Sequence, residues 1–182
     1  MTNTSTWITL TRDCDATMIP YGDRVALTEG GEVQVVQQLG GSITVRTPMG
    51  ALLRIDGVDA DAVGIELADD APASQSDGEF AIGHVVDALQ TVFDPEIPIS
   101  IVELGLVYRC DEVTRPDGSR LIEIDMSMTA PGCGMGDVLR ADAARVVGAV
   151  PGVDGVDVSL VWDPPWTMHR MSEAARLELG ML

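Results

Sequence analysis

Apolar and polar residues alternate with a period of two along residues 121–128, which is the pattern of a β-strand with one buried face. The apolar positions are Ile122, Ile124, Met126 and Met128. Upstream, apolar residues recur at helical spacing, which predicts a helix that Pro95 ends. Its apolar positions are Ile82, Val85, Val86, Leu89 and Phe93. Before this helix, Ser76 and Glu79 have the spacing of a capping box.

The same reasoning predicts the other elements of the C-terminal part. Strands are expected over residues 106–113 and 156–162, and helices over residues 137–149 and 172–179. Ser172 suits the N-cap of the last helix, and Gly180 suits its end. The element order α-β-β-α-β-α predicts a small α/β sandwich with its helices packed on one sheet.

The N-terminal part has short β-prone runs that glycine-containing turns separate. The runs cover residues 24–28, 32–38, 42–46 and 51–55. They predict a small β-rich module over residues 1–68. Residues 69–79 carry four acids, no base, and several Ala and Ser, which predicts an acidic linker before a domain over residues 80–182. The predicted fold class is therefore α+β.

The composition excludes several functions. The chain has 182 residues and a net charge of −18, and all 11 of its basic residues are Arg. Without lysine there is no Schiff-base chemistry and no P-loop. The acidic balance also argues against nucleic acid or a membrane as partner. No signal peptide and no apolar run of about 20 residues is evident, and the three cysteines lack CxxC spacing, so we expect a cytoplasmic protein with reduced thiols.

The sharpest chemical feature is a cysteine among glycines, Cys133, where the predicted strand gives way to a helix. Glycines let the backbone turn tightly, and a helix N-terminus favours the thiolate, which attacks electrophiles and binds soft metals. The alternative is a turn whose cysteine only packs. The spacing matches neither the dinucleotide-binding fingerprint, which needs glycine at Asp137, nor the cysteine-phosphatase loop, which needs arginine at Leu139.

Carboxylates form a second candidate group. Asp94 and Glu96 flank Pro95, and Glu103 follows shortly after. Held stiffly, they could ligate a metal, orient a thiol or act as a base; otherwise they are solvated acids after a helix.

The remaining candidates each have a structural alternative. Cys14 could be a metal ligand, although the acids beside it disfavour its thiolate. We expect Cys110 in the core, His84 exposed, and His169 either exposed or beside Cys133 as a ligand or base. The loop between Trp162 and Trp166 either seals the core edge or closes over the thiol.

At these positions the chain resembles a known family. Residues 94–98, 103–108 and 129–136 are similar to the small iron–sulfur assembly domain of the PaaD-like proteins. Residues 39–45, 162–166 and 171–181 narrow the resemblance to the SufT-like group of that family. The chain departs from the family pattern with Glu103 in place of Asp, and with Met168, His169 and Arg170 where a more acidic stretch is expected.

The resemblance implies an auxiliary, non-enzymatic factor in iron–sulfur protein maturation, with the assembly machinery and apo client proteins as partners. The loop thiol maps onto Cys133, within a turn that includes Thr129, Gly132 and Gly134, and the Asp-Pro-Glu element maps onto Asp94 and Glu96. A transient iron–sulfur cluster or iron is the implied cofactor. One cysteine cannot hold a cluster, so carboxylates, Cys14, the Cys133 of a homodimer mate, or a client must complete the ligands. A metal-free adaptor and a thiol enzyme are the alternatives.

Overall fold

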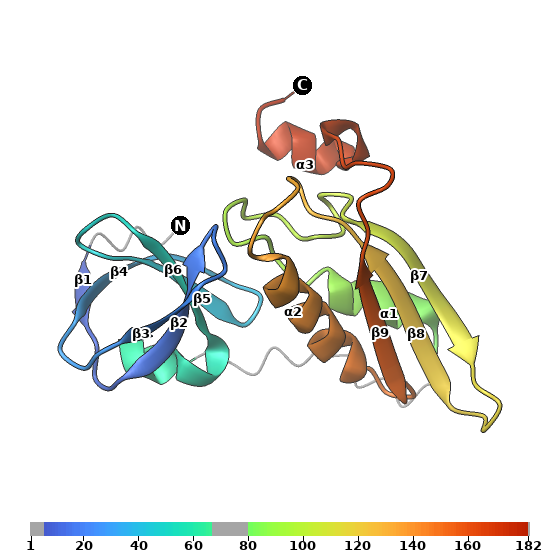
Figure 1. Ribbon diagram of the computed structural model, residues 1–182, viewed down its shortest axis with the longest axis horizontal. Helices are drawn as coiled ribbons and strands as arrows, with labels where there is room; N and C mark the ends of the chain where they lie inside the picture. The colour runs from blue at the N-terminus through green and yellow to red at the C-terminus, as the bar shows by residue number, and fades with distance from the viewer. Residues whose placement is uncertain (1–5, 67–79, 182) are drawn as a thin grey trace. The chain divides into compact units, whose positions relative to one another are not determined.

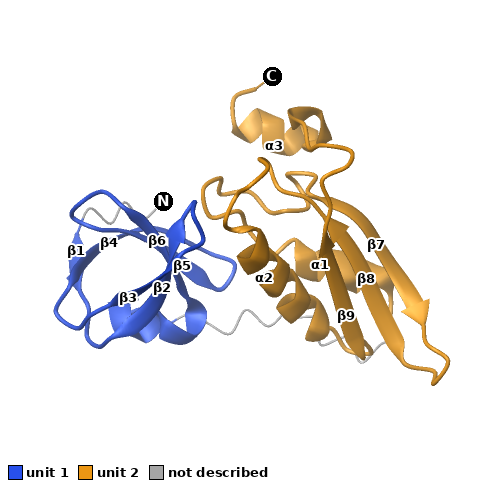
Figure 2. Cartoon of the chain, in the orientation of Figure 1, with its two compact units in different colours: residues 1–70 blue, residues 71–182 orange. Residues whose placement is uncertain are grey.

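The computed structural model of the chain describes residues 6–66 and 80–181 (Figure 1). The chain forms two compact units, residues 1–70 and residues 71–182 (Figure 2). The linker predicted over residues 69–79 lies outside the described residues, as do Ser76 and Glu79.

Within its described residues, the first unit is an antiparallel sheet of six strands in the order β1-β4-β5-β6-β2-β3, and Figure 1 shows the sheet curling on itself. The strands are β1 (Trp7–Thr9), β2 (Cys14–Ile19), β3 (Arg24–Leu27), β4 (Glu32–Leu39), β5 (Ser42–Arg46) and β6 (Leu52–Asp56). Their inward side chains form an apolar core that includes Val33, Ile43 and Ile55. A 3-10 helix, η1 (Gly57–Val63), adds Ala60, Ala62 and Val63 to this core.

Four of these strands lie where the sequence pattern predicts them, and β1 and β2 were not predicted. β2 buries Cys14, Ala16 and Ile19, which are separated by two and then three positions, so its alternation is broken. β1 has three residues and leaves Trp7 44% exposed, so it has no apolar pattern to recognise. Both strands depend on pairing with distant strands, β1 with β4 and β2 with β3 and β6.

The second unit has the predicted order of helices and strands. These are α1 (Ile82–Leu89), β7 (Val107–Thr114), β8 (Arg120–Met126), α2 (Gly136–Gly148), β9 (Gly155–Leu160), the 3-10 turn η2 (Met168–Arg170) and α3 (Glu173–Glu178). β8 lies between β7, which is antiparallel to it, and β9, which is parallel. Ile122, Ile124 and Met126 of β8 are buried, as are Leu139, Ala143, Val146 and Val147 of α2. The mixed α+β class is confirmed.

Three predicted elements were too long. The strand pattern over residues 121–128 continues past β8, which ends at Met126. The first helix ends at Leu89, because the N–H groups of Thr91 and Val92 bond three residues back and tighten the chain out of the α-helix. Phe93 instead makes an isolated bridge with Ser100. The last strand ends at Leu160, so Trp162 lies beyond it and is 45% exposed.

Two side chains differ from expectation in their burial. Cys110 was expected in the core and is half-buried, because it lies on β7, an edge strand of the three-stranded sheet. His84 was expected to be exposed and is half-buried near the start of α1. The predicted cap of the last helix is confirmed, since Ser172 Oγ accepts a hydrogen bond from the Ala175 N–H.

Candidate functional site

Three chain segments meet at one end of the three-stranded sheet. Because β7 and β8 are antiparallel, Val107 at the start of β7 pairs with Met126 at the end of β8. Because β8 and β9 are parallel, Met126 also pairs with Leu160 at the end of β9. The segment before β7, the turn after β8 and the chain after β9 therefore lie at the same end. The sequence places Glu103 on the first of these segments and Cys133 on the second.

The turn after β8 holds the four loop residues that the sequence singled out, Thr129, Gly132, Cys133 and Gly134. Cys133 is half-buried, its N–H donates to Ala130 O at 3.4 Å, and its C=O accepts from Gly136 N–H at 3.3 Å. Cys133 therefore lies two residues before Met135, the N-cap of α2, and the N-terminal N–H groups of this helix carry partial positive charge.

The two ends of this turn differ in the space around them. Gly132 has a φ of +79°, and a side chain there would meet no atom within 4 Å. Gly136, the first residue of α2, has no such room, because a Cβ would lie 3.1 Å from Leu160 Cδ1 and 3.6 Å from Met128 Cγ. The start of α2 is therefore pressed onto the sheet, while Gly132 has room on the side where a Cβ would lie.

Asp94 shapes the turn that follows α1. It is only 4% exposed, and its Oδ1 accepts hydrogen bonds from the N–H groups of Glu96 and Ile97, each at 2.9 Å. Burial raises the pKa of the Asp94 carboxyl, and the two N–H groups oppose that rise. Glu96 is exposed, and Pro95 between the two acids is buried. The Asp94 carboxylate therefore stabilises the backbone of its own turn. Glu96 is the carboxylate of this turn that is exposed to solvent.

Glu103 contacts the C-terminal segment. Its carboxylate Oε2 accepts a hydrogen bond from Ser172 Oγ, and its C=O accepts one from Ser172 N–H at 2.9 Å. Residues 161–181, which follow β9, are here called the C-terminal strap. Sequence reasoning noted both Glu103 and Ser172 and missed their contact, because 69 positions separate them.

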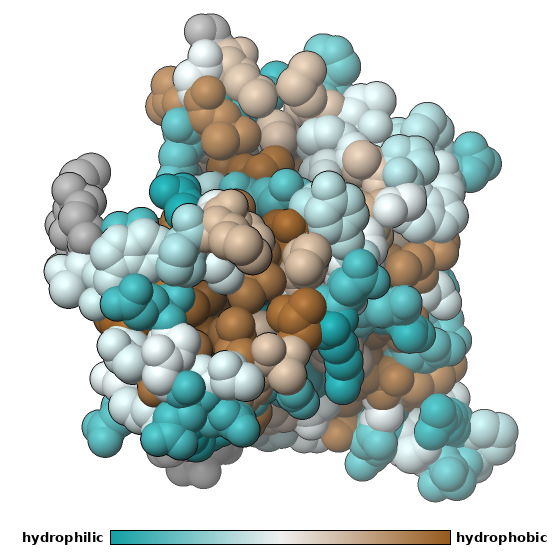
Figure 3. Space-filling model, turned by 60° about the vertical axis from the view of Figure 1, so that its left-hand side comes forward, coloured by the Kyte–Doolittle hydropathy of each residue, from teal (hydrophilic) through white to brown (hydrophobic). Residues whose placement is uncertain are grey.

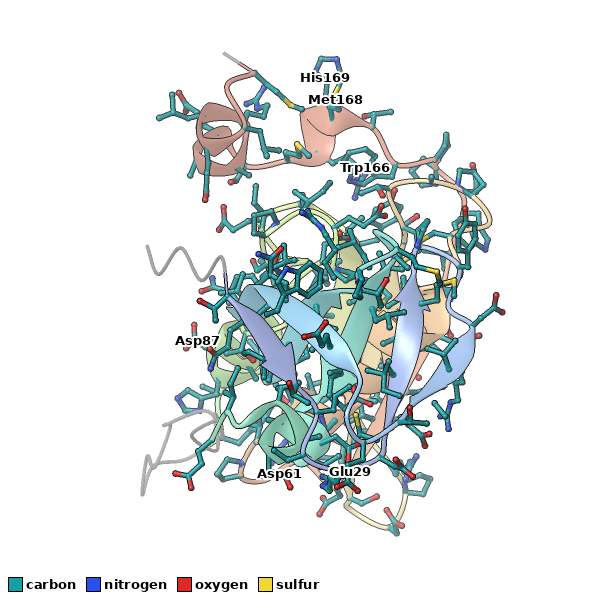
Figure 4. All side chains as sticks on the ribbon, turned by 90° about the vertical axis from the view of Figure 1, so that its left-hand side faces the viewer. Glu29, Asp61, Asp87, Trp166, Met168 and His169 are labelled. Atoms are coloured by element: carbon teal, nitrogen blue, oxygen red, sulfur yellow. The ribbon has the colours of Figure 1, made fainter. Side chains whose placement is uncertain are left out.

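Two further contacts hold the strap against the segment before β7. The Trp166 indole Nε1–H donates to Leu104 O at 2.8 Å. The Arg170 guanidinium lies 3.6 Å over the Tyr108 ring, and its Nε–H donates to Gly105 O at 3.3 Å. In Figure 4, Met168 and His169 lie on the outer side of the strap, and Trp166 lies on its inner side. Trp166 thus covers this edge of the unit, while Trp162 is exposed.

The other candidate residues are not brought together. Burial, chiefly, and the charge of Asp59 raise the pKa of the Cys14 thiol, and burial raises that of Cys110. His169 is exposed on η2. Among residues 6–66 and 80–181, no three or more His, Cys, Asp or Glu side chains gather closely enough to hold a metal ion. The same residues contain no helix long and apolar enough to cross a bilayer.

Comparison with known proteins gives a match for the site-bearing part of the chain. A model of the family described as "Iron-sulfur cluster assembly protein" matches residues 83–160, which include Asp94, Glu103 and Cys133. The strap and the first unit lie outside that match.

Three relatives with curated names are similar to this chain. An Fe-S protein maturation auxiliary factor of Porphyromonas gingivalis is 42% identical over 98 residues, which are 54% of this chain and 90% of the relative. The Fe-S protein maturation auxiliary factor SufT of Staphylococcus aureus is 38% identical over 90 residues, 50% of this chain and 98% of the relative. An iron–sulfur cluster carrier protein of Mycobacterium tuberculosis is 40% identical over 73 residues, 40% of this chain and 18% of the relative.

Proposed function

The chain belongs to the SufT-like family of iron–sulfur cluster assembly proteins, and we propose that it helps clusters reach client proteins through the thiol of Cys133. The observation that carries this proposal is the Cys133 turn. It sets a half-buried thiol in the turn that leads into α2, at the sheet end where three segments meet. The family match spans this turn.

The iron or cluster is cargo here. Soft metals prefer thiolate ligands, and a cluster usually has four protein ligands. Cys133 offers one, and no described group of side chains offers three. The other ligands would come from a client, a second copy of the chain or the exposed Glu96 beside the Asp94 turn. Cargo held by so few ligands is released readily, which suits a transfer role. Because thiolate ligands must stay reduced, we place this function in the cytoplasm.

Anaerobic reconstitution with ferrous iron and sulfide tests this role. We expect the native protein to gain visible charge-transfer absorbance and iron close to one cluster equivalent, and Cys133→Ser to lose both. Cys110→Ser is the matched control, since Cys110 is also half-buried but lies along β7. Equal iron in the native protein and Cys133→Ser would overturn the role of this thiol.

A metal-free adaptor is the second candidate function. It is favoured by the lack of a metal-holding group among the described side chains. An adaptor would bring apo clients to the assembly machinery without binding iron. It predicts that Cys133→Ser still captures an apo client and that neither form binds iron. A thiol enzyme has less support, because Asp94 is buried within its own turn and His169 is exposed on η2.

A further inference from the structure

The C-terminal strap is held by few, mainly polar contacts. The strap contacts residues 103–108 through the Ser172 hydrogen bonds to Glu103 and the Trp166 indole bond to Leu104. Arg170 adds its hydrogen bond to Gly105 and its contact with the Tyr108 ring. Of its side chains, Met171 and Ala175 are buried, at 4% and 2% exposure. The helix α3 has six residues, too few to be stable apart from its contacts. Such a segment belongs to the least stable part of a fold.

The docked strap also leaves polar groups without partners. Tyr108 Oη, whose ring lies under Arg170, and Arg176 Nε, on α3, are buried and find no hydrogen-bond partner among the described residues. A buried polar group without a partner opposes the docked state, because water would satisfy it when the strap lifts. The two unpartnered groups therefore lower the stability of the docked strap.

The strap exposes several large apolar side chains. Trp162, Met168, Leu177 and Met181 are between 45% and 66% exposed. They are four of the five large hydrophobic side chains that are exposed in the described part of the second unit, and the fifth is Ile82. Figure 3 shows apolar side chains at the top of the molecule, where Figure 1 places the strap. In a chain with a net charge of −18, the strap therefore carries apolar side chains on its surface beside charged ones.

We propose that the strap is a latch over the sheet end that carries Cys133, and that Glu103 is the positioning residue that keeps it closed. The Glu103 carboxylate accepts a hydrogen bond from Ser172 Oγ, and the same Oγ caps α3 by accepting from the Ala175 N–H. The carboxylate therefore holds the N-terminus of α3 against residues 103–108. Loss of the carboxylate contact weakens the hold on α3 and leaves the Ser172 N–H bond to Glu103 O, the buried Met171 and Ala175, and the Trp166 and Arg170 contacts as the remaining attachments. The opening of the latch does not depend on the proposed function. Only its partner does, an apo client that would take cargo at Cys133.

Two measurements without iron test the latch. Hydrogen exchange of residues 161–181 reports its opening, and alkylation of Cys133 by a bulky maleimide, located by mass spectrometry, reports access to the thiol. We expect Glu103→Ala to speed both about tenfold, as the loss of one charged hydrogen bond implies. Glu103→Gln keeps an acceptor oxygen and restores most of the protection. Glu112→Ala is the control, since it removes the Arg120 ion pair from β7 and leaves the strap alone.

The outcomes separate the latch from the proposed function. Arg170→Ala tests the second attachment and should also speed exchange in the strap. The latch is overturned if exchange in residues 161–181 matches the native protein in both Glu103→Ala and Arg170→Ala. It is also overturned if the strap opens faster while Cys133 labelling stays unchanged. If the protein fails to bind iron, the proposed function is contradicted. The hydrogen-exchange and labelling results still decide whether the latch exists, because neither uses iron.

Discussion

Gly105→Ala is the most direct test of how closely the strap approaches the rest of its unit. Gly105 has a φ of +66°, a conformation that L-residues other than glycine rarely adopt. An added Cβ would lie 2.1 Å from Arg170 O and 2.6 Å from Arg170 carbonyl carbon. Both neighbours are backbone atoms, so no side-chain rotation relieves the overlap. The strap must move away, and its contacts to residues 103–108 must weaken.

The expected loss has two parts. The left-handed backbone of an alanine costs about 1–2 kcal/mol. Moving the strap weakens the hydrogen bonds from Ser172 N–H and Trp166 Nε1–H, each worth about 1 kcal/mol. The chain entropy that a released strap regains offsets part of this second loss. We expect the free energy of unfolding of the second unit to fall by about 3 kcal/mol in all.

Gly118→Ala is the matched control. Gly118 has a φ of +84°, and a Cβ there would meet no atom within 4 Å, so this variant carries the backbone strain without the overlap. Urea unfolding followed by hydrogen exchange gives the stability of the second unit for each variant. Trp fluorescence without denaturant reports whether the Trp166 indole has moved into water. Equal losses for the two variants, with native exchange in residues 161–181, would refute the steric argument.

Three other outcomes follow from buried groups. Tyr108→Phe should leave the free energy of unfolding unchanged or raise it by up to about 1 kcal/mol, since it removes a buried hydroxyl that has no described partner; a loss above about 1 kcal/mol in urea unfolding would contradict this. Burial raises the folded-state pKa of Asp94 above its unfolded value, so its ionisation opposes folding, and the stability of the native protein relative to Asp94→Asn should rise as the pH falls through that pKa. A urea titration that shows the opposite slope would refute the desolvated state of Asp94. Cys14 should react slowly with iodoacetamide at neutral pH until the first unit unfolds, because burial raises its thiol pKa; fast labelling in the folded protein would contradict this.

Local patterns were enough to predict much of the second unit. The alternation along β8 gives a strand with one buried face because the period of two is a property of the strand itself. Ser172 could be recognised as a cap because its hydrogen bond reaches only to Ala175. The position of Cys133 between a strand and a helix is equally local, and the structure has it there.

Elements that depend on distant partners were missed or misjudged. β1 and β2 exist because β4, β3 and β6 supply their hydrogen bonds, and their own residues carry little apolar pattern. The helix expected to run to Pro95 ends at Leu89, although Phe93 continues its spacing. There the chain turns to pair Phe93 with Ser100, and Asp94 binds the N–H groups that follow it. Spacing alone does not show this competition between helix and turn.

In the candidate site, too, local features were predicted and a long-range contact was missed. The sequence predicts Glu103 as a carboxylate that supports the thiol, and it treats the last helix as a separate element. The structure joins them, because the Glu103 carboxylate accepts from Ser172 and Gly105 leaves room for the backbone of Arg170. Arg170 also gives a physical role to the stretch where the chain departs from the family pattern, since its guanidinium covers Tyr108. In the proposed latch, Glu103 therefore acts on Cys133 through the strap, and a variant that restores the Ser172 contact should restore control of the thiol.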